Sequence, residues 1–165
     1  MKNKFKSLLK RINFKGICLE VIAIIIIING LKRFYMAFHS EEYMALANYD
    51  LDKLDAMYDN GYFQFYLNQA YWMIGFTLFT ILLVGLLNWK NNLKFINSFL
   101  NFIIISAISF TGFFVKGPLN RFFDYCCKLL SEKFAVGYFV GGLLLCLTGL
   151  YTLWFNIHHC KTSEK

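Results

Sequence analysis

The stretch Ile17–Leu31, which reads ICLEVIAIIIIINGL, is fifteen residues long and is apolar except for Glu20 and Asn29. As an α-helix it reaches ~22 Å, and the apolar residues around and beyond Lys32 and Arg33 supply the rest of a ~30 Å hydrocarbon slab. A soluble domain could hardly cover a helix that carries isoleucine on every face. We therefore predict a transmembrane helix, with Lys32 and Arg33 snorkelling outward to the membrane surface.

The composition of the whole chain is also that of a membrane protein. Of its 165 residues, 58% are hydrophobic and 16% are charged, whereas soluble domains have about 45–50% and about 25%. Further long apolar runs follow the first, and we expect spans over about 17–36, 67–87, 95–115 and 134–155. The sequence thus predicts an all-α membrane protein, in which residues 1–165 form one four-transmembrane-helix bundle with short amphipathic interfacial helices.

The N-terminal segment Met1–Gly16 is basic, and its apolar residues recur at helical spacing. Six of the seventeen Lys and Arg residues of the chain lie in its first fifteen positions. Next to a membrane span, this clustering favours binding to anionic lipid headgroups over binding to nucleic acid. A cleaved signal peptide is the alternative, but the small residues at 45–47 lie too far beyond the apolar core for a usual cleavage site.

Residues 39–66 form an acidic outer loop, which we expect to fold as two short helices. Ser40 and Asp50 are the expected N-caps, and Asp59–Gly61 has the composition of a turn. The carboxylates of the loop lack the spacing of a calcium-binding loop. The loop is therefore a candidate surface for a membrane or extracytoplasmic protein partner.

Residues 118–131 are predicted to form an outer interfacial helix that begins with Pro118. Its expected apolar stripe consists of Leu119, Phe122, Phe123, Cys126 and Leu130. Its expected charged side consists of Arg121, Asp124 and Lys128. Because Cys126 and Cys127 lie on the side where disulfides can form, a membrane redox protein is one alternative function.

Basic residues indicate the orientation of membrane helices. With the N-terminus inside, the inner segments carry ten of the seventeen Lys and Arg residues and the outer loops carry seven. We therefore predict that both termini are cytoplasmic. The abundance of Ile, Lys, Asn and Phe is typical of AT-rich bacterial genomes, and the expected location is the bacterial plasma (inner) membrane.

Glu20 is the one acid inside a predicted span. Gly16, Ala23 and Gly30 share its stripe, and small residues at this spacing mark the face of a membrane helix that packs against other helices. Glu20 is thus predicted to point into the bundle, about one helical turn from the cytoplasmic surface.

Polar residues of the other spans lie at the same predicted depth. Asn97 and Asn101 of the third span and Thr152 of the fourth form, with the buried glutamate, a candidate site for a proton, an ion or a small ligand. The alternative is structural, because amides and hydroxyls join membrane helices without any ligand. In that case the glutamate could also pair with Lys15 or Lys94.

The remaining motifs give no sign of catalysis. Gly137 and Gly141 form a small-xxx-small motif, for which we expect a helix contact within the chain. The run His158–Cys160 lacks the spacing of zinc ligands. Nucleotide-binding, metalloprotease and hydrolase motifs are missing from the sequence. We therefore predict no cofactor, no metal and no catalytic residue.

The segment Leu19–Ile22 (LEVI), with Lys32 beyond it, resembles the first span of the small multidrug-resistance exporters. The resemblance implies that Glu20 exchanges protons for cationic drugs. It covers the first span only, since this chain adds a basic N-terminal segment and a long acidic outer loop.

The leading hypothesis is a non-catalytic binding, accessory or protective subunit that acts through its outer loops. Distinctive sequence is concentrated in residues 39–66 and 116–133, and enzyme motifs are missing. The alternative is a proton-coupled transporter of a small cationic or apolar solute, with Glu20 as the titrating group and the three polar residues named above lining its site.

Overall fold

The computed structural model describes residues 13–91 and 95–163. Within these ranges all regular secondary structure is helical, which confirms the all-α prediction. The basic N-terminal helix was predicted over Met1–Gly16, and its first twelve residues lie outside the described ranges, as does Lys94.

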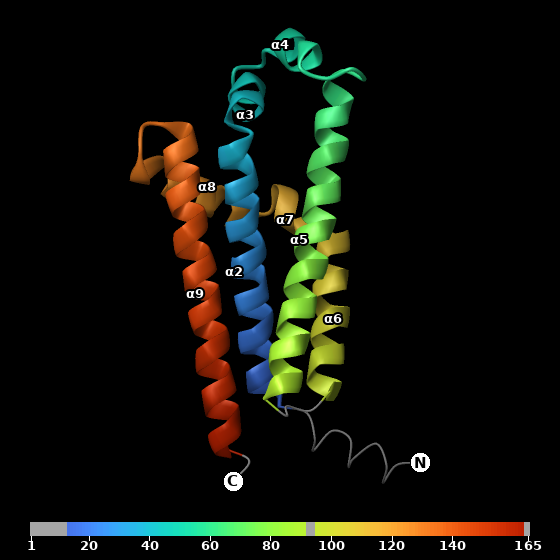
Figure 1. Ribbon diagram of the computed structural model, residues 1–165, viewed down its shortest axis with the longest axis vertical. Coiled ribbons are helices and arrows are strands. Elements are labelled where there is room, and N and C mark those ends of the chain that lie inside the picture. The colour runs from blue at the N-terminus through green and yellow to red at the C-terminus, as the bar shows by residue number, and fades with distance from the viewer. Residues whose placement is uncertain (1–12, 92–94, 164–165) are drawn as a thin grey trace.

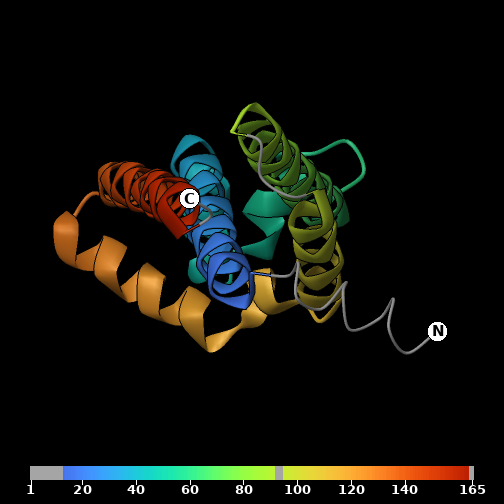
Figure 2. The same ribbon diagram turned by 90° about the horizontal axis from the view of Figure 1, so that it is seen from below.

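Long helices of the described chain lie side by side along one axis (Figure 1). They are α2 (Phe14–Phe38), α5 (Tyr62–Lys90), α6 (Phe95–Phe110) and α9 (Phe134–Ser163). Seen along that axis, α2 lies in the middle, with α9 on one side and α5 and α6 on the other (Figure 2). Because α2 packs against all three, the apolar stretch that begins the chain's membrane pattern is the central helix.

Short helices join the long ones. α3 (Ser40–Ala47) and α4 (Leu51–Ala56) connect α2 to α5 at one end of the bundle. They form the hairpin that the sequence predicts to lie on the outer side, and we call it the outer hairpin. α7 (Phe113–Lys116) and α8 (Pro118–Leu130) follow α6. α8 lies across the side of the bundle and packs against α9 (Figures 1 and 2).

Among the described residues, three helices are long and apolar enough to cross a membrane. They cover Phe14–Phe38, Tyr62–Lys90 and Phe134–His159, with 25, 29 and 26 residues. The prediction of a continuous helix over 95–115 is wrong. α6 ends at Phe110, and Gly112 has a left-handed φ of 70° before α7 begins. The 16 residues of α6 reach ~24 Å. The chain is thus a helical protein with three candidate membrane spans and a shorter apolar helix.

Glycines bring the backbones of α2 and α9 together. A Cβ atom at Gly30 would lie 2.6 Å from the Cys146 Sγ, and one at Gly149 would lie 3.0 Å from the carbonyl oxygen of Ala23. Real Cβ atoms do not approach other groups so closely without displacing them, so glycine permits this contact. This glycine contact brings α9 close enough to α2 for polar side chains of the two helices to meet.

Gly137 and Gly141 make a different contact. A Cβ atom at Gly137 would lie 2.5 Å from the carbonyl oxygen of Cys127, and Gly141 faces the Cys127 side chain. This pair of glycines therefore packs against α8 of the same chain.

The N-caps of the outer hairpin differ from the prediction at one position. Ser40 is not the N-cap of α3, because His39 occupies that position and its backbone continues the hydrogen bonds from α2 into α3. Asp50 is confirmed as the N-cap of α4, where its Oδ1 accepts the Lys53 N–H at 3.1 Å.

Candidate functional site

Glu20 is buried in the bundle, with 3% of its surface exposed. Its carboxylate accepts N–H bonds from three asparagines, each on a different helix. The Asn88 Nδ2 of α5 lies 3.1 Å from Oε2, and the Asn156 Nδ2 of α9 lies 3.1 Å from Oε1. The Asn101 Nδ2 of α6 also donates to Oε2. One side chain of the central helix thus joins all the long helices that surround it.

The three asparagines are themselves buried. The Asn88 Nδ2 donates in addition to the Ser98 Oγ at 2.9 Å, and the Asn156 Nδ2 donates to the carbonyl oxygen of Gly16 at 3.2 Å. We refer to Glu20, Asn88, Ser98, Asn101 and Asn156 as the Glu20 cluster. It lies toward the ends of the helices that carry the predicted cytoplasmic segments.

The sequence-predicted residues fall at different places relative to this cluster. Asn101 contacts Glu20, whereas Asn97 lies one turn earlier on α6 and its buried Oδ1 has no hydrogen-bond partner among the described residues. The Thr152 hydroxyl donates to the carbonyl oxygen of Thr148 at 2.8 Å and is therefore engaged within α9. Its expected place beside the glutamate is taken by an asparagine one turn further along that helix.

Sequence reasoning missed Asn88 and Asn156, because each is the first residue after a predicted span. The predicted spans 67–87 and 134–155 end where their apolar runs end, but α5 and α9 continue as helices beyond these points. The spacing of the two asparagines from earlier residues of α5 and α9 would have indicated that they face inward. Val84 precedes Asn88 by four positions and Gly149 precedes Asn156 by seven, and all four residues are buried on the inner face of their helices.

No ion pair compensates the Glu20 carboxylate within the described residues. Lys15, one of the two predicted partners, is exposed, and the other lies outside the described ranges. The described buried atoms without a hydrogen-bond partner at this end of the bundle are the Oδ1 atoms of Asn97 and Asn101, which are both acceptors. Among the described residues, this end of the bundle thus has two unpaired acceptors and no cation paired with Glu20.

A groove between α5 and α6 adjoins the cluster. It encloses a cavity of about 560 Å³ whose wall includes Ser98 and Asn101 at one end. Its other lining side chains are apolar, with Trp89, Phe99 and Phe102 as aromatic members. The groove thus forms an apolar cavity with the Asn101 amide of the Glu20 cluster at one end.

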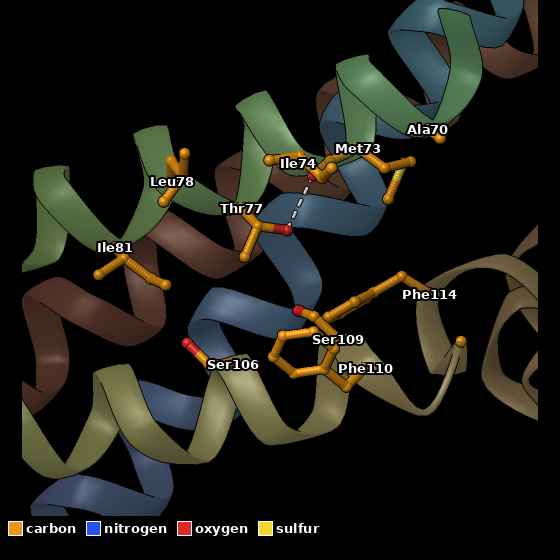
Figure 3. A pocket seen from close by; sticks show the side chains of 11 residues that line it. Ala70, Met73, Ile74, Thr77, Leu78, Ile81, Ser106, Ser109, Phe110 and Phe114 are labelled. Carbon is orange, nitrogen blue, oxygen red and sulfur yellow. Dashed lines mark hydrogen bonds between the residues drawn. The ribbon is translucent and has the colours of Figure 1, made fainter. Parts of the chain in front are cut away.

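A second cavity of about 540 Å³ lies further along the same two helices (Figure 3). Ile81 lines both cavities. In Figure 3, Thr77 of α5 and Ser109 of α6 lie at the wall, and their hydroxyls donate to carbonyl oxygens of their own helices at 2.8 and 2.9 Å. These two hydroxyls are already bonded, so Ser106 is the remaining polar side chain in the described lining of this otherwise apolar cavity.

Lys32 and Arg33 are buried in the opposite half of α2, so the predicted snorkelling is wrong. The Lys32 Nζ donates to the carbonyl oxygen of Phe114 at 3.0 Å and to the Asn120 Oδ1 at 2.9 Å. α7 and α8 cover this turn of α2 and supply the acceptors that water would supply at a surface.

Arg33 pairs with Asp124 of α8, with 2.8 Å between Nη2 and Oδ1. Its Nη1 donates to the Asn29 Oδ1 at 3.0 Å, and its Cζ lies 5.7 Å from the ring centre of Phe123, a cation–π distance. The guanidinium is fully buried. This ion pair therefore holds α8 against the central helix.

One residue of the predicted charged side of α8 faces the bundle. Asp124 pairs with Arg33, whereas Phe122 and Leu130 of the predicted apolar stripe are exposed. A buried guanidinium without a carboxylate partner costs several kcal/mol. The ion pair therefore accounts for the inward position of Asp124.

The two adjacent cysteines of α8 differ in exposure. Cys127 is buried under α9 and Cys126 is half-buried, and both thiols are free. Burial raises the pKa of the Cys127 thiol. Since the thiolate is the reactive form, this geometry does not favour redox chemistry at the pair. In the described chain no three His, Cys, Asp or Glu residues converge as metal ligands; the side chain of Cys160 lies outside that description.

The fold and the site define a helical protein with three helices suited to a membrane and a buried carboxylate held by amides of three neighbouring helices. Comparison of the chain with protein-family models, with curated proteins and with solved structures gives no match. A function for this chain therefore has to be argued from its own geometry.

Proposed function

We propose that the protein is a four-span transporter of the bacterial plasma membrane that exchanges a small cationic or apolar solute for a proton at Glu20. In this proposal α6 is the remaining span. Its ~24 Å cross most of the hydrocarbon layer, and α7 lies at its outer end. Both termini are cytoplasmic. The observation that supports it best is the Glu20 carboxylate, bonded to amides of α5, α6 and α9 without a described cation.

An ionised carboxylate in apolar surroundings is costly unless positive charge compensates it. A proton on Glu20 removes the charge, and a cationic solute beside it balances the charge. Because both occupants satisfy the same carboxylate, each weakens the binding of the other by the same factor. That mutual exclusion is the coupling that an exchanger requires.

The groove between α5 and α6 supplies room for the solute. Its volume of about 560 Å³ falls in the range of ~300–1,000 Å³ found for small-molecule sites. The cavity ends at Ser98 and Asn101, and Asn101 donates to Glu20. A solute at this end therefore lies one side chain away from the group that binds the proton.

Exchange is tested in liposomes that contain the purified protein and an enclosed pH-sensitive dye. An inward gradient of benzylguanidinium, which remains charged and does not cross as a neutral base, should make the interior alkaline. Glu20→Gln should abolish this signal, and Glu41→Gln, which alters an exposed carboxylate on α3, should retain it. Glu20→Asp keeps a carboxyl group and should retain part of the exchange even if its stability falls. An unchanged signal in Glu20→Gln, or a wild-type signal no larger than that of protein-free vesicles, would contradict exchange at Glu20.

A binding or accessory role is the second candidate, and the outer hairpin favours it. Tyr49 between α3 and α4 is 89% exposed and has a φ of 57°, while Met44 and Leu51 nearby are also exposed. An aromatic side chain held outward in this way suits contact with another protein. Purification in mild detergent should then yield a partner that is lost when residues 41–59 are deleted. A monomer with solute-driven proton movement would instead favour exchange.

A further inference from the structure

We propose that the groove between α5 and α6 binds an amphiphile with a protonated primary amine head and an alkyl chain, which enters sideways from the bilayer. This inference rests on the proposed function, because it names the class of solute that meets Glu20. It also selects a primary ammonium over other cations, which the presence of a carboxylate alone does not do.

The head group follows from the atoms that lack partners. The Oδ1 atoms of Asn97 and Asn101 are buried acceptors without a hydrogen bond among the described residues, and Asn101 lies at the groove. A buried acceptor left without a hydrogen bond destabilises the folded protein. A primary ammonium carries positive charge toward Glu20 and N–H donors for these oxygens. A quaternary ammonium of the same charge has no donor to offer.

Aromatic rings surround the same end of the groove. Trp89, Phe99 and Phe102 line the cavity together with Asn101. The faces of such rings attract a cation that has lost part of its water. The rings therefore stabilise an ammonium head next to the amides without providing a second carboxylate.

The alkyl chain follows from the length of the groove. The cavity beside Asn101 and the cavity shown in Figure 3 share Ile81, and together they follow α6 from Ser98 to Ser109. Eleven residues of helix correspond to ~17 Å. The hydroxyl of Ser109 is already bonded to its own helix. Besides the similarly bonded Thr77, the Ser106 hydroxyl is the one further polar group of the described lining between these ends, and the rest of the wall is apolar. This lining matches a molecule with one charged end and a long apolar chain.

Access from the bilayer is indicated by the exposure of the rim. Leu82 and Leu86 on α5, and Phe99 and Phe102 on α6, line the cavity and are exposed on the outer surface of the bundle. In a membrane this apolar surface faces lipid. An amphiphile dissolved in the bilayer can therefore reach the groove without passing through water.

Two glycines of α5 give a matched pair of test variants. Gly85 lines the cavity beside Asn101, whereas Gly75 lines neither cavity. A Cβ atom added at either position meets nothing within 4 Å. Gly85→Phe should therefore fill the groove, and Gly75→Phe should place the same ring elsewhere on the same helix.

The test is thermal unfolding of the protein in lipid nanodiscs with added dodecylammonium. A ligand that binds the folded state raises the Tm, and above its Kd the rise grows with the logarithm of the ligand concentration. We expect such a rise for wild type and for Gly75→Phe, a much smaller rise for Gly85→Phe, and almost none for Glu20→Gln. At equal concentration, dodecyltrimethylammonium and dodecanol should raise the Tm less than dodecylammonium, and butylammonium should have little effect.

The outcomes separate this inference from the proposed function. An equal rise with dodecyltrimethylammonium or dodecanol, or a full rise in Gly85→Phe, overturns the amine amphiphile in this groove. If benzylguanidinium still drives proton movement through Glu20, the exchange proposal stands without it. A selective rise with dodecylammonium, together with no proton movement for any cation, supports the binding site and contradicts exchange.

Discussion

Asn156 of α9 and Glu20 of α2 lie 136 positions apart in the sequence, and the Asn156 Nδ2 lies 3.1 Å from the Glu20 Oε1. The same nitrogen lies 3.2 Å from the carbonyl oxygen of Gly16, one turn earlier on α2. One amide thus holds both the carboxylate and the backbone of the central helix. The last helix of the chain thereby takes part in the site that the first described helix begins.

Replacing Asn156 by Leu should destabilise the protein by about 1–3 kcal/mol, because the Glu20 Oε1 then loses its buried amide donor. Thr152→Val is the matched control one turn earlier, since the Thr152 hydroxyl bonds only within α9 and its loss should cost less than about 1 kcal/mol. Unfolding by heat in mild detergent measures both. Equal losses in the two variants would show that the Asn156–Glu20 bond contributes little.

Removing the carboxylate opposite Arg33 should be more costly. Asp124→Leu leaves the fully buried guanidinium without its ion-pair partner, for which we expect a loss of about 3 kcal/mol. The double variant Arg33→Met with Asp124→Leu should recover part of that loss, because no unpaired charge remains. A double variant as unstable as the sum of the single variants would contradict this coupling.

Cys127 should react with a maleimide roughly tenfold more slowly than Cys126 at pH 8, because burial restricts access and its raised pKa keeps the thiolate scarce. Peptide mapping by mass spectrometry after short labelling times distinguishes the two adjacent thiols. Since the pKa is raised, the Cys127 rate should still be increasing with pH where the rate of an ordinary thiol levels off. Equal rates at all pH values would contradict the packing of Cys127 under α9.

The four-span proposal predicts the side of the membrane on which single cysteines react. Asp52→Cys in α4 and Glu132→Cys after α8 should be labelled on intact cells by an impermeant reagent, and Lys90→Cys at the end of α5 should not. All three native residues are exposed, so a failure to react reports location and not burial. Labelling at Asp52 but not at Glu132 would mean that α6 does not cross the membrane.

The sequence by itself determined the helical class, the first apolar stretch as a candidate membrane helix and the inward direction of Glu20. Each of these follows from local pattern, because five consecutive isoleucines exclude an exposed helix and small residues on one stripe define a packing face. Asn101 could be selected in the same way, from its depth in the third apolar run.

The tertiary structure decided which polar groups meet. Asn88 and Asn156 join Glu20 because α5 and α9 stay helical beyond their apolar runs, which hydropathy does not report. Arg33 is buried because α8 brings Asp124 to it from 91 positions away. The position of a helix end depends on capping and packing, and the partner of a buried charge depends on which helix lies beside it. Neither is contained in the periodicity of one segment, because both arise only when separate segments pack together.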